Sequence, residues 1–257
     1  MTWCHPRARW SVLGALLLAL VLADAGAAQG RKPKAPPGRD PGGIAVAVIG
    51  HGVDYLRPEI APRIARDGEG EPIAWDLGDN DNRPIERGST GAALQGANAP
   101  HSALAHLVLR EAGATRLVVA RRKPGDRDGL ARATAFAAQT PARIVLVLHD
   151  GVGAENWGLL REAAQHFRRQ LLIVPVAAAV AIDAGAPLPA DFGAANVITV
   201  TTPRDEQAMF GQTWPVVRAD IAAASVLDLQ GGSSVTGLRA PLGPEAAAAR
   251  VAALAAR

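Results

Sequence analysis

The stretch from Ile44 to Ile60 contains residues that could build a functional site at the end of a strand. It opens with an unbroken apolar run, Ile44 to Ile49, rich in β-branched residues. A run without polar alternation is typical of a strand buried on both faces, as in a parallel sheet covered by helices. Gly50 and Gly52 follow on either side of His51 and allow a sharp turn. Open α/β sheets place their sites at this carboxyl end of the strands, so the turn is a candidate site.

Phosphate binding is one chemistry that such a turn could support. Gly50, His51 and Gly52 begin the G-x-G-x-x-G pattern, in which a strand-to-helix turn holds the pyrophosphate of a dinucleotide. Tyr55 stands where the third glycine belongs, and Pro58 follows too soon for the helix that would hold the phosphates. We therefore expect no nucleotide and no other cofactor at this turn.

The polar loop from Gly78 to Pro100 is a second candidate because it is acidic at its start. With Asp76, the residues Asp79 and Asp81 offer carboxylates that a calcium ion could use. The spacing lacks the glycine at the sixth position and the glutamate at the twelfth that define an EF-hand loop. We expect a solvated loop with no bound metal, although the sequence leaves calcium binding by Asp76 to Asp81 open.

The turn also belongs to a longer motif. Val48-Ile49-Gly50-His51-Gly52-Val53-Asp54 and the following Pro58-Glu59-Ile60 resemble the first conserved block of the subtilisin-like serine proteases (peptidase family S8). That block reads roughly V-I-D-T-G-V-D-x-x-H-P-E-L, and the two align without a gap. The resemblance implies a serine-type endopeptidase fold, but the catalytic aspartate of the family falls on Gly50.

The resemblance places the catalytic histidine at His101. The segment from His101 to Arg121 is similar to the family's histidine block, and Arg110-Glu111-Ala112 with Arg116-Leu117-Val118 set the register. In the family this histidine takes the proton of a serine, and the aspartate fixes its tautomer. By residue type alone, a histidine at a helix start such as His101 is more often a surface or capping residue. His106, one turn further on, is a weaker candidate.

The nucleophile implied by the resemblance is Ser234. Gly232 to Thr236 is similar to the family's G-T-S block, after which the family has a buried helix. Here Gly237 to Gly243 looks like an insertion before that helix, and it contains two glycines and a proline that disfavour helix. A simple Gly-Ser turn is the alternative interpretation.

Other positions that the resemblance marks as chemical are altered. The strand expected to end at the oxyanion asparagine, Leu171 to Val176, continues into alanines instead. The expected substrate-binding strand, Ile144 to Asp150, has bulky residues in place of polar ones and glycines, and Asp220 to Ala224 lacks a proline and a glycine. Asp54 is a poor substitute for the missing aspartate because it is a usual residue of its own block. The resemblance thus implies the fold more strongly than the activity.

Residues 1 to 27 are typical of a secretory signal peptide. Arg7 and Arg9 precede an apolar core, Ser11 to Ala23, and Ala25-Gly26-Ala27 fits a cleavage site. The core is shorter than the roughly 20 residues that span a bilayer. We expect export to the periplasm or the medium, with no membrane span after cleavage; an uncleaved anchor is the alternative. Cys4 precedes the core, so the mature chain would have no disulfide.

The remaining composition excludes few functions. Residues 28 to 43 are rich in proline, glycine and basic residues, which predicts a flexible leader before a domain at 44–257. The net charge is only +3, the arginines are scattered and aromatic residues are sparse. We therefore expect no nucleic acid as a partner.

Strand-like and helix-like segments alternate through the chain and would position these residues. We predict strands at 44–49, 72–77, 116–120, 142–148, 171–179, 196–202 and 220–223. We predict helices at 101–112, 129–139, 156–169 and 244–256. This alternation predicts an α/β fold, a three-layer α/β/α sandwich around a mostly parallel sheet.

Three functions are compatible with these observations. The favoured hypothesis is an exported subtilisin-like domain that has lost most catalytic power and binds a peptide or a partner protein. A weakly active serine endopeptidase that uses Ser234 and His101 is the first alternative, and a structural envelope protein is the second. The oligomeric state is not predicted by any feature of the sequence.

Overall fold

The computed structural model describes residues 32, 34–87, 99–126, 128–148, 157–175, 193–201, 221–222 and 244–257. The chain divides into two units, Met1–Lys34 and Ala35–Arg257, and every element below belongs to the second unit. The predicted signal peptide and Ser234 lie outside the described residues. No helix among the described residues is long and apolar enough to cross a bilayer.

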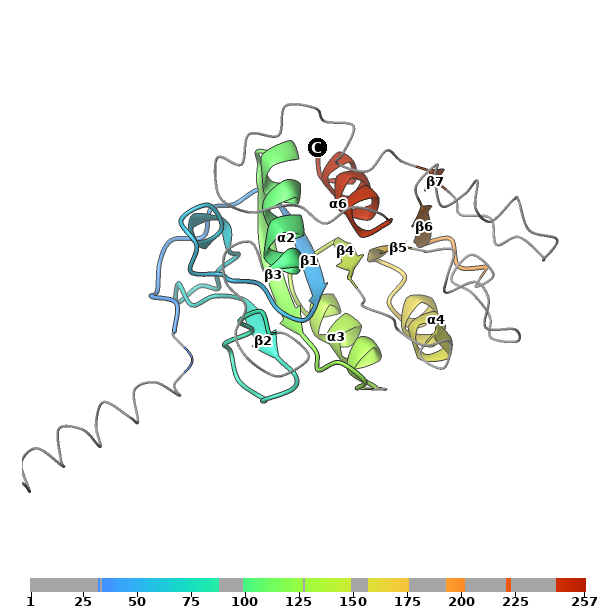
Figure 1. Ribbon diagram of the computed structural model, residues 1–257, viewed down its shortest axis with the longest axis horizontal. Helices are drawn as coiled ribbons and strands as arrows, with labels where there is room; N and C mark the ends of the chain where they lie inside the picture. The colour runs from blue at the N-terminus through green and yellow to red at the C-terminus, as the bar shows by residue number, and fades with distance from the viewer. Residues whose placement is uncertain are drawn as a thin grey trace, which may run out of the picture. The chain divides into compact units, whose positions relative to one another are not determined.

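The strands of the described part form one parallel sheet in the order β2-β3-β1-β4-β5-β6-β7 (Figure 1). Their bounds are β1 (Ile44–Gly50), β2 (Ala74–Asp76), β3 (Thr115–Arg121), β4 (Ile144–Val147), β5 (Leu171–Pro175), β6 (Val197–Thr201) and β7 (Ile221–Ala222). All seven match strands predicted from the sequence, and β1 lies between β3 and β4 near the centre of the sheet.

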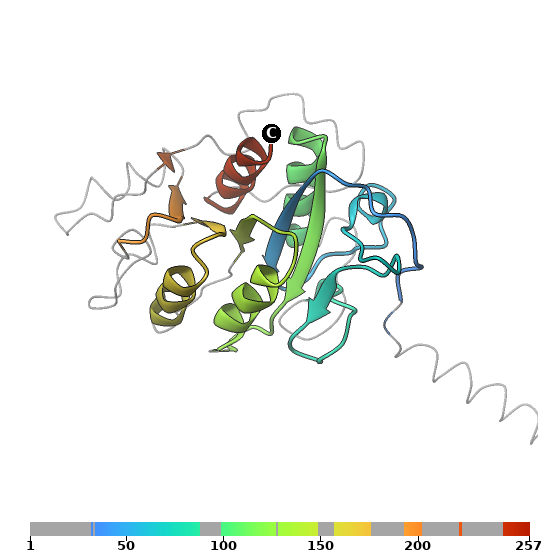
Figure 2. The same cartoon turned by 180° about the vertical axis from the view of Figure 1, so that it is seen from behind.

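Helices cover both faces of this sheet. The helix α2 (Pro100–Glu111) and the helix α6 (Pro244–Ala255) lie on one face, and α3 (Gly129–Ala138) and α4 (Trp157–His166) lie on the other (Figures 1 and 2). A short 3-10 turn, η1 (Ala61–Arg63), follows β1. The predicted three-layer α/β/α sandwich with a parallel sheet is confirmed.

The continuous apolar run of β1 is explained by burial on both faces. Val46 and Val48 pack in the core beneath α2 and α6, whereas Ala45, Ala47 and Ile49 pack in the core beneath α3 and α4. Each face of the strand therefore removes apolar surface from water, and polar alternation would bury unpaired polar groups.

The small residues of α6 allow it to pack closely in the core. Six of its alanines are fully buried between α2 and the sheet, where a side chain without rotamers loses no conformational entropy: Ala246, Ala247, Ala248, Ala249, Ala252 and Ala253. The structure describes this helix from Pro244. Proline is well suited to a first helical position because its missing N–H would have no partner in the helix.

Part of the predicted leader contacts the domain. Most residues between Ala35 and Gly43 are exposed, yet Ala35 is buried in the core beneath α2 and α6. The Asp40 carboxylate accepts the backbone N–H of Arg66 at 2.9 Å and pairs with Arg116. The exact boundary between leader and domain stays a prediction.

Candidate functional site

The turn after β1 is held against the segment Pro84–Arg87. Gly52 has φ +100°, and a Cβ at this position would lie 2.5 Å from the carbonyl oxygen of Pro84 and 2.6 Å from that of Ile85. Glycine is therefore required here both by the backbone conformation and by the close approach. The backbone N–H of Arg87 donates to the carbonyl oxygen of His51 at 3.1 Å and closes the contact.

The structure brings Gly50 and His101 together. His101 lies in the first turn of α2 and is 1% exposed. A Cβ built on Gly50 would lie 2.6 Å from Nδ1 and 2.8 Å from Cε1 of its imidazole, and 3.2 Å from Cβ of Leu148. The imidazole thus occupies the space that a side chain at position 50 would need.

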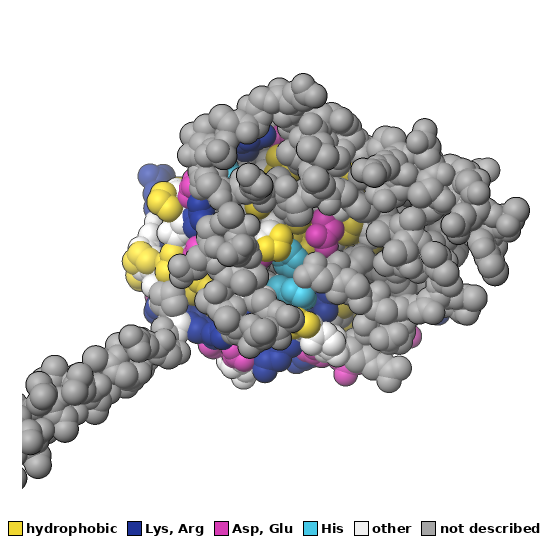
Figure 3. Space-filling model, viewed as in Figure 1, with side chains coloured by type: hydrophobic (Ala, Val, Ile, Leu, Met, Phe, Trp, Pro, Cys, Tyr) yellow, Lys and Arg dark blue, Asp and Glu magenta, His cyan; other side chains and the backbone are white. Residues whose placement is uncertain are grey.

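A hydrogen bond from His51 determines the tautomer of the neutral His101 ring. The backbone N–H of His51 donates to Nδ1 of His101 at 2.8 Å, and the two rings lie 5.0 Å apart, tilted by 36°. A neutral imidazole has one donor nitrogen and one acceptor nitrogen. Because Nδ1 is the acceptor, the proton of the neutral ring is on Nε2. Figure 3 shows histidine side chains side by side near the middle of one face of the molecule.

Glu86 is a buried carboxylate that the sequence analysis missed. One oxygen accepts the backbone N–H of His101 at 2.8 Å, and the other accepts the backbone N–H of Ser102 at 2.7 Å and the Ser102 hydroxyl. These N–H groups belong to the first turn of α2 and have no partner within the helix. Glu86 is therefore the cap of α2, supplied from another segment.

The burial of Glu86 disfavours the charged form of its carboxyl. Its side chain is 1% exposed. Burial raises the pKa of the carboxyl above its ordinary value, although nearby His101 and the hydrogen bonds from Ser102 and the helix backbone act in the opposite direction. The Ser102 hydroxyl also accepts the backbone N–H of Asp54 at 2.8 Å, which links the cap to the turn after β1.

Asp54 and His106, the two weaker candidates from the sequence, do not contact Nδ1 of His101. Burial raises the pKa of the Asp54 carboxyl, which accepts the backbone N–H of Leu56 and lies near Arg57 and Glu59. Burial lowers the pKa of His106, whose charged neighbours are Glu59, Arg110 and Arg57. Neither residue is placed at Nδ1 of His101, where the triad aspartate of the family would act.

The remaining predicted positions are only partly described. Ser234 and the alanines after β5 lie outside the described residues, as do His149, Asp150 and the segment Ala223–Gly243. The expected substrate-binding strand is β4, and Leu148 at its end is fully buried beside Gly50 and His101.

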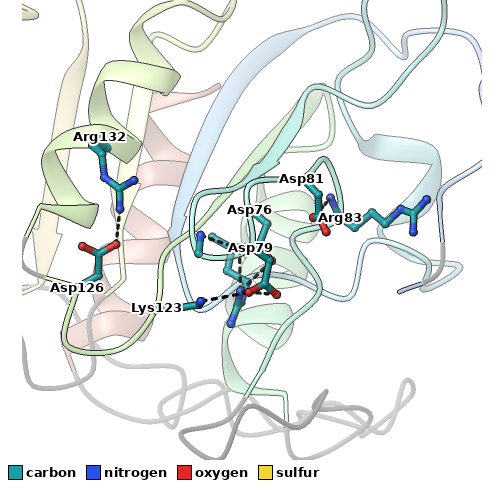
Figure 4. A network of polar contacts seen from close by, with 9 residues as sticks. Asp76, Asp79, Asp81, Arg83, Lys123, Asp126 and Arg132 are labelled. Atoms are coloured by element: carbon teal, nitrogen blue, oxygen red, sulfur yellow. Dashed lines mark hydrogen bonds and ion pairs between the residues drawn. The ribbon is translucent and has the colours of Figure 1, made fainter. Parts of the chain in front are cut away.

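The acidic residues at the end of β2 and the start of the following loop form an ion-pair network (Figure 4). Asp76 is fully buried, and both of its carboxylate oxygens accept from one guanidinium nitrogen of Arg121, at 2.7 and 2.8 Å. Asp79 lies 3.7 Å from the same nitrogen and 3.3 Å from the Lys123 ammonium. Asp76 ends β2, within the strand predicted at 72–77, and a cation from β3 compensates its buried charge.

No metal site is formed in the described part of the chain. Within those ranges, no three histidine, cysteine, aspartate or glutamate side chains come close enough to hold a metal ion. In the acidic loop, the guanidinium of Arg121 occupies the Asp76 oxygens that a cation would need.

Known structures share this architecture. An epidermin leader peptide processing serine protease from Staphylococcus aureus matches with a TM-score of 0.52 at 12% identity, over 83% of this chain and 64% of that one. A lanthipeptide protease matches with a TM-score of 0.50 at 14% identity, over 84% of this chain and 74% of that one. The chain therefore spans less than two thirds of the length of the epidermin protease. A scan against models of protein families finds no match, and neither does a search of curated proteins.

These likenesses show the fold and nothing further. The α/β architecture with a parallel sheet and flanking helices is subtilisin-like, as the motif around Gly50 predicted.

Proposed function

We propose that this chain is a catalytically impaired subtilisin-like protein that binds a peptide or a partner protein without cleaving it. The observation that carries the proposal is the hydrogen bond from the His51 backbone N–H to Nδ1 of His101, formed beside Gly50.

This bond gives His101 the wrong form for a general base. In a Ser-His-Asp triad, Nδ1–H donates to the carboxylate, so that Nε2 is free to take the proton of the serine. Here Nδ1 accepts a proton donor, and Nε2 of the neutral ring carries the hydrogen. In a serine protease whose triad aspartate was changed to an amide, the wrong tautomer lowered kcat by about 10⁴-fold.

The space around Gly50 supports the same proposal. A side chain at this position would have to displace the His101 imidazole, because Nδ1 lies 2.6 Å from the place of its Cβ. The buried carboxylate of the site, Glu86, caps α2 instead of orienting the imidazole through Nδ1. In the sequence, Gly237 to Gly243 lies between Ser234 and Pro244, and its two glycines and its proline disfavour the helix that would hold the nucleophile in the family.

An extended peptide is the ligand class that we propose. The epidermin protease named above processes a leader peptide, and it shares the fold. A domain that keeps this fold but lacks the general base would hold such a chain without turnover.

The first experiment is labelling with a fluorophosphonate probe, which reacts with activated serines. The purified mature protein and its Ser234→Ala variant are compared, with circular dichroism to show that both are folded. We expect no labelling of either protein. Ser234-dependent labelling would instead show an activated nucleophile and a weakly active serine endopeptidase.

A binding measurement separates the remaining functions. Fluorescein-labelled fragments of unfolded casein are titrated with both proteins, and anisotropy and fragment size are recorded. The proposal predicts saturable binding, intact fragments and equal affinity for the Ser234→Ala variant. Fragments that bind neither protein would favour a structural envelope protein.

Export is the other part of the proposal. It is supported by Arg7, Arg9 and the apolar run from Ser11 to Ala23. Secretion of the full chain followed by amino-terminal sequencing should give a mature chain that begins at Ala28. Retention of Met1 in a membrane fraction would show an uncleaved anchor.

A further inference from the structure

Glu86 connects three segments that are distant in the sequence. Its carboxylate lies in the segment Pro84–Arg87, which is hydrogen-bonded to the turn after β1 through Arg87 and His51. Its oxygens hold the first turn of α2 through the backbone N–H groups of His101 and Ser102. His101 itself reaches back to the turn, where Nδ1 accepts from His51. The three contacts form a closed loop around the histidine.

The chemistry of these contacts requires a carboxylate. The backbone N–H groups of His101 and Ser102 are donors, and each points at a different oxygen of Glu86. The Ser102 hydroxyl accepts from the backbone N–H of Asp54, so its own hydrogen is directed to Glu86. An ionised carboxylate is an acceptor at both oxygens, whereas an amide would turn an NH₂ group toward one of these donors.

We propose that Glu86 is the positioning residue of the histidine site: by fixing the first turn of α2, it holds the His101 imidazole on the His51 N–H, in the Nε2–H form. The inference deepens the proposed function and rests on it for its meaning, but the form of His101 can be measured without a ligand.

The geometry explains why the cap and the imidazole move together. His101 is the residue whose backbone N–H binds Glu86, and its side chain binds the turn after β1. A shift of the first turn of α2 therefore displaces the imidazole directly. The contact of Nδ1 with His51 depends on a separation of 2.8 Å, and such a bond weakens steeply when distance and angle change.

The experiment reads the form of His101 by nuclear magnetic resonance. Protein labelled with ¹⁵N in its histidines is studied at neutral pH by long-range proton–nitrogen correlation of the imidazoles. The signal of His101 is assigned by comparison with His101→Gln. We expect the pattern of a fixed Nε2–H ring in the unmodified protein.

Glu86→Gln is the principal variant, and Glu111→Gln is its matched control. Glu111 lies at the other end of α2 and pairs with Arg250 at 3.2 Å, so its loss also removes a carboxylate and a partner from this helix. We expect Glu86→Gln to lose the fixed pattern and to give the averaged signals of exchanging tautomers. We expect Glu111→Gln to keep the fixed pattern.

Ser102→Ala keeps the proposal testable if Glu86→Gln does not fold. This variant removes the hydroxyl from the cap and leaves both backbone contacts, so we expect a partial shift of the His101 signals in the same direction. A fixed pattern in folded Glu86→Gln would overturn the proposal. A fixed pattern in Ser102→Ala, should Glu86→Gln be unfolded, would overturn it as well.

The outcomes separate this inference from the proposed function. Ser234-dependent labelling by the fluorophosphonate probe would end the proposed function, whatever Glu86 does. An unchanged His101 signal in Glu86→Gln would end the inference while leaving an unlabelled protein as a binding domain.

Discussion

Two buried carboxylates of this molecule, Asp76 and Glu86, are stabilised in different ways. Asp76 is 0% exposed at the end of β2 and meets the guanidinium of Arg121 on the neighbouring strand, with which it is in register. Glu86 is 1% exposed and meets backbone N–H groups and a hydroxyl at the start of α2.

The difference indicates different roles. The Asp76–Arg121 pair neutralises two buried charges between adjacent strands, so its main consequence is for stability. The charge of Glu86 is compensated by dipoles at the start of a helix, and burial raises the pKa of its carboxyl. Because that helix carries His101, the second arrangement controls the geometry of the candidate site.

The largest effect is expected from removing the Arg121 guanidinium that pairs with Asp76. Arg121→Met leaves the Asp76 carboxylate buried without its counter-charge, and we expect a loss of about 3–5 kcal/mol in the free energy of unfolding. Urea unfolding measures this loss. The signal of His101 should keep its fixed pattern in any fraction that remains folded.

Two further variants show whether the loss arises from the buried charge. Adding Asp76→Asn to Arg121→Met removes the uncompensated charge and should recover part of the lost stability. Lys123→Met breaks only a pair that is half exposed, and we expect a loss of about 1 kcal/mol or less. Equal losses for Lys123→Met and Arg121→Met would contradict our description of the network.

A smaller effect is expected at the histidine site, from adding a side chain at Gly50. The Cβ of Gly50→Ala would force the His101 imidazole out of its present position. We expect a loss of about 1–3 kcal/mol in the free energy of unfolding. Gly113→Ala is the matched control, since a Cβ there has nothing within 4 Å and should change stability by about 0.5 kcal/mol or less.

Gly50→Asp tests the same position for catalysis. It restores the carboxylate of the family motif, but the imidazole occupies its space. We therefore expect no gain in labelling by the fluorophosphonate probe. A gain that disappears in Gly50→Asp/Ser234→Ala would show that the site readjusts to a working triad.

The smallest effect concerns the pH dependence of stability and involves His106 of α2. Burial lowers the pKa of His106 below its ordinary value of 6.5. The unfolded chain then binds more protons than the folded protein between the two pKa values, so this histidine contributes stability above pH 6.5 that is lost as the pH falls through its folded pKa.

His106→Gln should lack this contribution. The stability difference between the unmodified protein and the variant, from urea unfolding at pH 5 and pH 7.5, should be more favourable to the unmodified protein at the higher pH. The opposite sign would mean that His106 is charged in the folded state, stabilised by Glu59.

Much of the fold was predictable because runs of apolar residues mark the strands of the sheet. The unbroken run of β1 indicated burial on both faces, and the structure places Val46 and Ala47 in opposite cores. The meeting of Gly50 with His101 also followed from the two motif blocks, although only through resemblance to known sequences.

The second carboxylate was not predictable in the same way. Glu86 lies in a polar loop, and nothing in its neighbours distinguishes it from an exposed glutamate. Asp76 was placed in a predicted strand, but its ion pair was not predicted because Arg121, its partner, is far away in the chain. The signal that could have found them is only general: a fully buried strand end and a helix start without a local capping side chain both need a partner.

The sequence by itself determined the layers of this protein, because the period of apolar residues decides which surfaces leave water. It also determined the absence of a carboxylate at position 50. Tertiary structure alone decided what replaces that carboxylate: the His51 N–H binds Nδ1 of His101, and Glu86 fixes the helix that carries it. Hydrogen bonds depend on distance and direction between groups brought together by folding, and residue order does not record either.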